Sequence, residues 1–204
     1  MQSTVILLSG ACFVGKTFIK SAWLKKNDHN FKWFGGSFAQ ALKDEMHEQG
    51  LIDKKKLTDA LYKATVRKAM QDYGQEKRKE NKFYLAQILE NKMKDVDSGA
   101  TYVIDDWRFL SEAEYFETMG YKVVRLKVIR PVELMIESVG HSVVIEYLEN
   151  HSKDISEREL DNEYRVNANF YDNIIFNNQN GTSHLINKLQ EIENAMNKAV
   201  KYES

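Results

Sequence analysis

Cysteine and proline are almost absent from this chain of 204 residues. It contains one cysteine, Cys12, and one proline, Pro131. A single cysteine excludes an internal disulfide framework and is typical of proteins from a reducing compartment. The five histidines have no metal-ligand spacing with one another or with Cys12, so we expect no zinc site.

The chain also lacks long apolar runs and a net charge of one sign. No stretch approaches the roughly 20 apolar residues that span a bilayer, and residues 1–4 lead into the first apolar run without a basic leader. The formal net charge is −1, which does not favour a nucleic-acid partner. We therefore expect a cytoplasmic protein whose partners include neither a membrane nor a nucleic acid.

The composition suits a single globular α/β domain, because 43% of the residues are hydrophobic and 29% are charged. Apolar runs bounded by turn formers predict strands, and apolar residues at helical spacing separate them. The five predicted strands are residues 4–8, 31–34, 101–106, 122–129 and 173–176. This alternation predicts a three-layer α/β/α fold with a mainly parallel five-stranded sheet.

Two long segments between predicted strands have helical patterns only. Residues 37–99 are much longer than a crossover needs, and we interpret them as a helical insertion over the carboxyl edge of the sheet, where ligands of open α/β folds bind. Residues 131–165 fit a mobile cover and an ordinary surface hairpin equally well. The core of the single domain 1–204 is then formed by residues 1–36, 100–130 and 170–204.

The most specific motif follows the first predicted strand and reads G-x-x-x-x-G-K-T. This pattern is a phosphate-binding loop, in which glycines allow a turn whose N–H groups point at one phosphate. Its lysine reaches the β- and γ-phosphates, and its threonine offers a hydroxyl to Mg²⁺. We expect the nucleoside triphosphate to be bound by Gly10, Ala11, Cys12, Phe13, Val14, Gly15, Lys16, Thr17 and Phe18.

Two acids end the third predicted strand, beside the strand that carries the loop. Either Asp105 or Asp106 could hold Mg²⁺ through water, but side chains alternate along a strand, so only one of them can face the loop. Arg108 follows directly and suits a bidentate grip on phosphate. A salt bridge with Asp105 or Glu112 is an equally good interpretation of this arginine.

The order of these motifs resembles the phage-type deoxynucleoside monophosphate kinase family over most of the chain. The segments that carry the resemblance are Gly10 to Thr17, Ser37 to Lys43, Arg67 to Gly74, Asp106 to Glu114, Arg130-Pro131, Ser156-Glu157 and Tyr171 to Asn177. The resemblance implies a P-loop kinase with an acceptor-binding region at 37–99 and a lid at 131–165. It further implies ATP and Mg²⁺, a deoxynucleoside 5′-monophosphate acceptor, and the cytoplasm of a phage-infected host. A homodimer is left open.

The resemblance also implies residue roles. Thr17 and Asp106 would serve the metal, and the acceptor would be bound by Lys43, Arg67, Gln71 and Arg108. The lid arginines do not map cleanly onto the motifs of the family. We expect Lys16, Asp106, Arg108, Arg130 and Arg158 to take part in catalysis, with Arg165 as an alternative lid arginine. The chain departs from the family in its apolar loop interior and in the bulky Trp107.

A phosphate-binding loop does not by itself determine a reaction. One alternative is a P-loop kinase that acts on another acceptor, such as a hydroxymethylated base in DNA or a small phosphometabolite. A second is a non-catalytic, nucleotide-binding regulatory protein. The low net charge disfavours DNA. The arginines disfavour a regulatory protein, because nucleotide binding alone does not require them.

Overall fold

The computed structural model describes residues 2–28, 32–93, 99–151, 159–178 and 183–202. Its five strands form one sheet in the order β2-β3-β1-β4-β5, and every neighbouring pair is parallel. The strands are β1 Thr4–Ser9, β2 Trp33–Gly36, β3 Thr101–Ile104, β4 Lys122–Ile129 and β5 Asn173–Phe176. The predicted parallel five-stranded sheet is confirmed.

The bounds of three strands differ from the prediction: β1 extends to Ser9, β2 begins at Trp33 and extends to Gly36, and β3 ends earlier than expected. Gly35 and Gly36 belong to β2 rather than ending it, because the pairing with β3 continues to Gly36 opposite Ile104. A Cβ at Gly36 would lie 3.0 Å from Cγ1 of Ile104, so a glycine permits this close approach. The strand β3 ends at Ile104, two residues before the predicted end, and Asp105 and Asp106 follow it.

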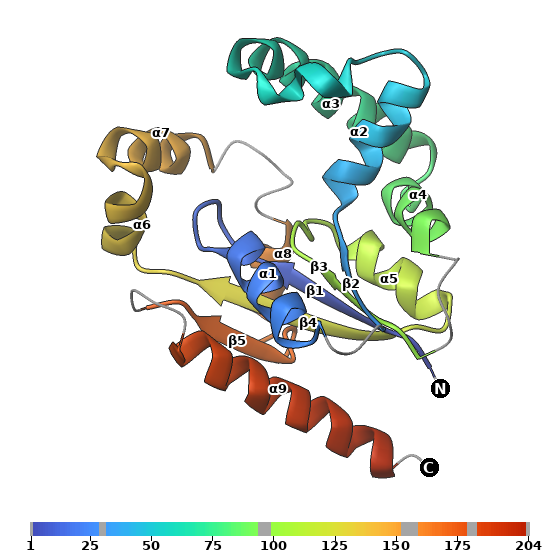
Figure 1. The fold of residues 1–204 in the computed structure, drawn as a ribbon, viewed down its shortest axis with the longest axis vertical. Coiled ribbons are helices and arrows are strands. Elements are labelled where there is room, and N and C mark those ends of the chain that lie inside the picture. Colours follow the sequence, from blue (N-terminus) through green and yellow to red (C-terminus); the bar gives the residue numbers. More distant parts are fainter. Residues whose placement is uncertain (1, 29–31, 94–98, 152–158, 179–182, 203–204) are drawn as a thin grey trace.

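The two faces of the sheet bury alternate residues of each strand. Ile6 and Leu8 of β1 belong to one apolar cluster, whereas Val5 and Leu7 belong to the other. The first cluster is covered by α1 Lys16–Lys26, which crosses in front of the sheet in Figure 1, and by α9 Ser183–Tyr202, which runs below β5 in that view. The second is covered by α4 Tyr84–Met93 and α5 Leu110–Thr118. The result is the predicted three-layer arrangement.

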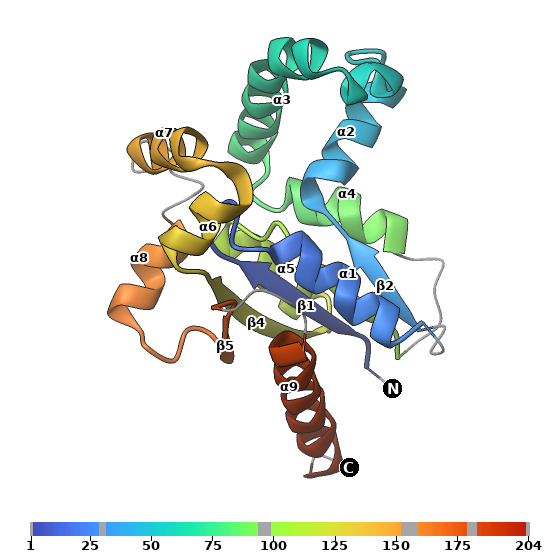
Figure 2. The same cartoon turned by 60° about the vertical axis from the view of Figure 1, so that its left-hand side comes forward.

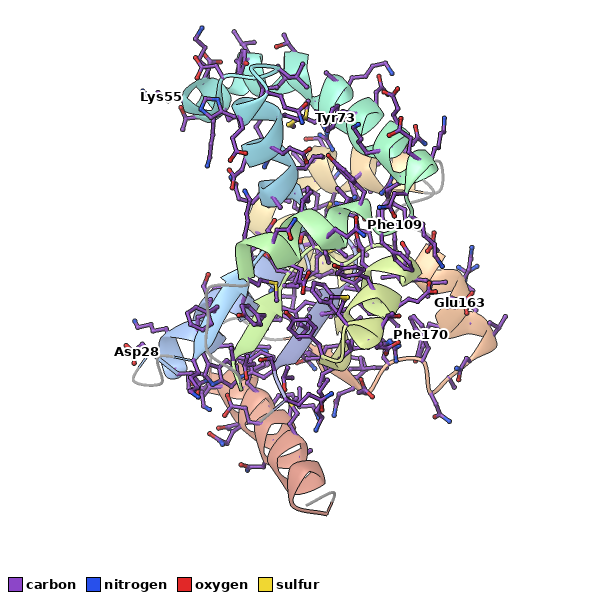
Figure 3. The ribbon with its side chains drawn as sticks, turned by 90° about the vertical axis from the view of Figure 1, so that its right-hand side faces the viewer. Asp28, Lys55, Tyr73, Phe109, Glu163 and Phe170 are labelled. Atoms are coloured by element: carbon purple, nitrogen blue, oxygen red, sulfur yellow. The ribbon has the colours of Figure 1, made fainter. Side chains whose placement is uncertain are left out.

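The segment after β2 forms helices joined by short turns in the residues that the structure describes. It contains α2 Phe38–Glu48, the 3₁₀ helix η1 Lys54–Thr58, α3 Ala60–Glu80 and then α4. The helix α3 begins at Ala60 because Asp59 caps it, accepting the N–H groups of Leu61 and Tyr62 at 2.8 and 3.1 Å. Tyr73, labelled in Figure 3 where α3 faces α2, donates a hydrogen bond to Gln49, the residue that follows α2.

The segment after β4 forms α6 Val132–Val139, α7 His141–His151 and α8 Glu159–Val166. Met135 of α6 and Val144 of α7 are buried in the cluster that contains Ile6 and Leu8. These two helices are therefore packed onto the body of the protein, and they lie beside the loop between β1 and α1 in both Figure 1 and Figure 2. None of the described helices is long and apolar enough to cross a membrane.

Candidate active site

The phosphate-binding loop joins the end of β1 to the start of α1. Gly10 and Gly15 have φ angles of 136° and 93°, a region that side chains other than glycine rarely adopt. A Cβ on Gly10 would lie 2.3 Å from the carbonyl oxygen of Val128 on β4. The two glycines therefore allow the loop to turn tightly against the sheet and to lead directly into the amino end of α1.

Lys16 lies across its own loop. Its Nζ donates hydrogen bonds to the carbonyl oxygens of Gly10 and Ala11 at 2.5 and 2.7 Å. The ammonium group is thus held above the residues that precede α1, where the phosphate groups of a nucleotide would lie.

Thr17 is joined to the third strand through Asp105. The Oγ1 of Thr17 donates to Oδ2 of Asp105 at 2.5 Å, and Lys20, one turn further along α1, forms an ion pair with the same carboxylate. Asp105 is only 7% exposed. A hydroxyl and a carboxylate are the oxygen ligands that Mg²⁺ prefers, so Thr17 and Asp105 together fit a metal position.

Asp106 faces a different element, and this corrects the expectation that it partners Thr17. Its carboxylate accepts hydrogen bonds from Oγ of Ser37 at 2.8 Å and from the N–H groups of Phe38 and Ala39 at 3.0 and 2.8 Å. Asp106 therefore caps the amino end of α2, where backbone N–H groups have no partner within the helix. The side-chain alternation along the strand sends the two acids apart.

Arg108 lies beside the phosphate-binding loop. It lines a small cavity of about 20 Å³ together with Gly10 and Ala11 of the loop and Asp161 of α8. The walls of this cavity come from the residues that follow β1 and β3 and from α8, so the tertiary fold brings Arg108 next to the loop.

Glu112 holds the backbone that carries Arg108. Its Oε2 accepts the N–H groups of Arg108 and Phe109 at 3.0 and 3.1 Å. Burial raises the pKa of Glu112 to about 8, although these two hydrogen bonds act in the opposite direction. The nearby charge of Asp106 adds to the rise. Glu112 thus fixes the first turn of α5 and the residues just before it.

The residues proposed for the acceptor lie on the helices above the sheet. Lys43 is on α2, and Arg67 and Gln71 are exposed on α3. Their side chains make no hydrogen bond or ion pair with another residue in the described ranges. Figure 1 shows α2 and α3 on one side of the molecule and α6 and α7 on the other, above the same edge of the sheet. Their role stays a prediction.

The lid arginines are placed differently from one another. Arg130, at the end of β4, donates through Nη2 to the carbonyl oxygen of Leu134 and to Oγ of Ser138, so its guanidinium is held against α6. Arg165 is exposed on α8. Arg158 lies outside the described residues.

Sequence comparison assigns the family. A model of the phosphomevalonate kinase family matches residues 8–122, more than half of the chain. The chain belongs to this family. The matched segment contains the phosphate-binding loop, Asp105, Asp106 and Arg108. The protein is thus a P-loop kinase, a nucleotide-binding phosphotransferase.

Three solved structures are similar to this family member over most of its length. Shikimate kinase from Acinetobacter baumannii in complex with shikimate has 11% identity and a TM-score of 0.44, with 98% of this chain and 94% of that chain covered. Shikimate kinase from Aquifex aeolicus has 14% identity and a TM-score of 0.43, covering 95% and 98%. Deoxyadenosine kinase from M. mycoides with products dCMP and a flexible dCDP bound has 15% identity and a TM-score of 0.42, covering 96% and 100%. A search of curated proteins finds no match.

The structure adds three residues to the site of this phosphomevalonate kinase family member. Lys20 pairs with Asp105, and its position one turn after Thr17 on the same helix could have identified it. Asn177, which follows β5, donates through Nδ2 to the carbonyl oxygen of Val14 in the loop at 2.9 Å. Tyr147 of α7 contacts Cys12 and Phe13, and no sequence pattern points to it.

Mg²⁺ fits the site only if the protein and the nucleotide phosphates coordinate it together. The described part of the chain contains no group of three or more His, Cys, Asp or Glu that could hold a metal by itself. P-loop proteins bind Mg²⁺ through one or two side chains, with phosphate oxygens and water completing the shell. Thr17 and Asp105 meet that requirement, with the Lys20 ammonium as a competing cation on the carboxylate.

Proposed function

We propose that this protein transfers the γ-phosphoryl group of ATP to a phosphate monoester, and that the acceptor is a deoxynucleoside 5′-monophosphate. The products are ADP and a deoxynucleoside diphosphate. The observation that carries the proposal is the cavity that Arg108 shares with Gly10 and Ala11. A guanidinium group beside the donor phosphates suits phosphoryl transfer and is not needed for nucleotide binding alone.

The chemistry requires positioning rather than a general base. A phosphate monoester oxygen is already anionic near neutral pH, so the protein has to neutralise charge, align the two substrates and exclude water. Lys16 would exchange its two carbonyl partners for donor phosphate oxygens, and Arg108 would contact the transferred group. Thr17 and Asp105 would hold Mg²⁺, which neutralises phosphate charge when it is bound.

The deoxynucleotide acceptor is supported by the motif order. Lys43, Arg67 and Gln71 match positions of the phage-type deoxynucleoside monophosphate kinases, and α2 and α3 carry them above the carboxyl edge of the sheet. This is the edge at which open parallel sheets bind their ligands.

Phosphomevalonate is the second candidate acceptor, and the family match favours it. It shares the phosphate monoester with a deoxynucleotide, so Arg108 and Lys16 would act in the same way. Phosphomevalonate lacks a base, so α2 and α3 would need to bind a base only if the acceptor is a deoxynucleotide.

A coupled assay of ADP release tests both candidates. The purified chain would be supplied with ATP, Mg²⁺ and, one at a time, dAMP, dCMP, dGMP, dTMP and phosphomevalonate. ADP release that depends on one of the deoxynucleotides supports the leading proposal. ADP release with phosphomevalonate alone would reject the deoxynucleotide acceptor and support phosphomevalonate as the acceptor. Release that depends on none of them would reject both.

Replacement of the loop lysine tests the donor half of the site. Lys16→Ala removes the charge that would bind the donor phosphates, and we expect kcat to fall by about 10²–10³-fold or more. Lys25→Ala is the matched control, since Lys25 is exposed near the end of the same helix. Equal activity in the two variants would contradict the assignment.

A further inference from the structure

Tyr147 of α7 rests on the phosphate-binding loop through two contacts. Its hydroxyl oxygen accepts the backbone N–H of Cys12 at 3.0 Å. Its ring meets the ring of Phe13 edge to face, with the centroids 5.6 Å apart and the planes at 82°. We call this arrangement of Cys12, Phe13 and Tyr147 the tyrosine latch.

The backbone at Phe13 suggests that the latch has a function. Phe13 is the one non-glycine residue with a positive φ among the described residues, at 66°. A bulky residue is strained in such a conformation. Phe13 is also 37% exposed, so burial in the core does not explain it. Its edge-to-face contact with Tyr147 does provide a reason for an aromatic ring there.

The helix that delivers Tyr147 is anchored to the core. Val144 lies three residues earlier on α7, and so on the same face, and it is fully buried with Ile6, Leu8 and Val14. Met135 of α6 joins the same cluster. Figure 2 shows α6 and α7 adjacent to the loop, with the turn between them at Gly140. The position of the Tyr147 hydroxyl is therefore set by core packing.

A phosphate-binding loop binds its ligand through backbone N–H groups, and Tyr147 engages one of them. We propose that Tyr147 gates the donor site: its hydroxyl competes with a nucleotide phosphate for the N–H of Cys12, and nucleotide binding displaces it. The inference rests on the nucleotide-binding part of the proposed function and not on the identity of the acceptor. It also explains the apolar loop interior, since Phe13 provides the surface on which the tyrosine rests.

Binding of ATP and ADP tests the gate directly. Titration calorimetry with each nucleotide and Mg²⁺ would compare the unmodified chain with Tyr147→Phe, which keeps the ring and removes the hydroxyl. A neutral hydrogen bond of ordinary strength corresponds to a factor of about two to ten in affinity. We expect Tyr147→Phe to bind nucleotide about two- to tenfold more tightly.

Tyr62→Phe is the matched control. The hydroxyl of Tyr62 on α3 also accepts a backbone N–H, that of Asp53, at 2.7 Å, far from the loop in the sequence and on a different helix. This variant loses the same kind of hydrogen bond, and its nucleotide affinity should equal that of the unmodified chain.

Hydrogen exchange of the Cys12 amide provides a second readout. Followed by NMR, this amide should exchange faster in Tyr147→Phe than in the unmodified chain without nucleotide. With ADP bound the two proteins should exchange at the same rate, because the phosphate then protects the amide in both. Phe13→Leu, which removes the ring contact, should shift exchange and affinity in the same direction.

The outcomes separate this inference from the proposed function. Nucleotide binding by the unmodified chain, with equal or weaker binding by Tyr147→Phe, would overturn the gate and leave the kinase proposal standing. A chain that binds neither ATP nor ADP would overturn both. Tighter binding by Tyr147→Phe, with Tyr62→Phe unchanged, would establish the gate.

Discussion

Asp105 and Asp106 are neighbours in the chain, yet they act on different elements. Asp105 contacts Thr17 and Lys20 on α1, whereas Asp106 caps α2. The physical cause is the alternation of side chains at the end of β3. One acid therefore belongs to the donor phosphates and the other to the helical region that follows β2.

The two acids should respond differently to the same substitution. Asp105→Asn removes a charged ligand from the metal position, so we expect kcat/KM to fall by about 10–100-fold and the Mg²⁺ concentration for half-maximal rate to rise. Activity measured over a Mg²⁺ titration would show this.

Asp106→Asn is the matched comparison. It weakens the cap of α2, so the free energy of unfolding should fall by about 1 kcal/mol, while the half-saturating Mg²⁺ concentration stays unchanged. Urea denaturation would measure the first effect. If instead the Mg²⁺ response shifts in Asp106→Asn alone, Asp106 is the metal-side acid.

Asn177 is a positioning residue for the phosphate-binding loop. It is buried, and its amide donates to the carbonyl oxygen of Val14 next to Gly15. A Cβ on Gly15 would lie 2.7 Å from Nδ2 of Asn177, so the glycine makes room for this amide. Asn177→Asp has the same shape but cannot donate, and its charge would face a carbonyl oxygen.

We expect Asn177→Asp to raise the KM for ATP by about tenfold, because the loop loses a buried hydrogen bond. The KM for the acceptor should change little. Steady-state kinetics with each substrate varied in turn would separate the two effects. Asn178→Asp is the control, since Asn178 is exposed. A KM for ATP that rises equally in both variants would argue against a specific role for Asn177.

At the scale of elements, α9 is joined to α1 by one buried carboxylate. Glu193 of α9 accepts hydrogen bonds from Nε1 of Trp23, from Nζ of Lys26 and from Nδ2 of Asn27. The side chain of Trp23 is fully buried. Three donors at the end of α1 thus depend on a single residue of the last helix.

Glu193→Ala should lower the free energy of unfolding by about 2–4 kcal/mol, because it leaves buried donors without an acceptor. Urea denaturation followed by tryptophan fluorescence would measure the change. Glu191→Ala, on the same helix, removes only an exposed ion pair with Lys188, and we expect a change below about 0.5 kcal/mol. Similar losses in the two variants would contradict the role given to Glu193.

At the scale of the whole molecule, the pH dependence of stability reflects the raised pKa of Glu112. Folded Glu112 keeps its proton up to about pH 8, whereas the ordinary value in an unfolded chain is 4.5. Between these values the folded state binds more protons than the unfolded state. This residue therefore makes stability fall as the pH rises from 4.5 to about 8.

Asp44 contributes to the pH dependence of stability at lower pH than Glu112 does. Burial tends to raise its pKa, but hydrogen bonds from Lys54, Lys92 and Gln40 outweigh burial and lower it from 3.8 to about 2. The stability that it contributes is lost only as the pH falls through that range, so it does not overlap with the contribution of Glu112.

Glu112→Gln should flatten the pH dependence above pH 5, with up to about 1.4 kcal/mol per pH unit removed. The glutamine can still accept the N–H groups of Arg108 and Phe109 and has no proton to lose. Thermal unfolding measured at several pH values between 5 and 8 would detect the effect. An unchanged slope would mean that Glu112 is already ionised in the folded protein at these pH values.

Features that depend on residues close in the sequence could be predicted, whereas features that depend on distant contacts could not. The bounds of β4 and β5 were predicted correctly, because their apolar runs are long or are bounded by turn formers. The end of β2 was wrong, because the contact that allows Gly36 into the strand is made with Ile104, far along the chain. The position of Asp106 could not be predicted for a related reason: its partners on α2 are brought to it only by folding.

The sequence by itself determined the phosphate-binding loop, the parallel α/β architecture and the P-loop kinase superfamily, because each rests on short-range patterns of glycine, lysine and apolar residues. Only the tertiary structure decided which acid faces Thr17, that Arg108 lies beside the loop, and that Tyr147 rests on Cys12 and Phe13. These contacts join residues distant in the chain. Their geometry depends on how the helices pack on the sheet, which local periodicity does not specify.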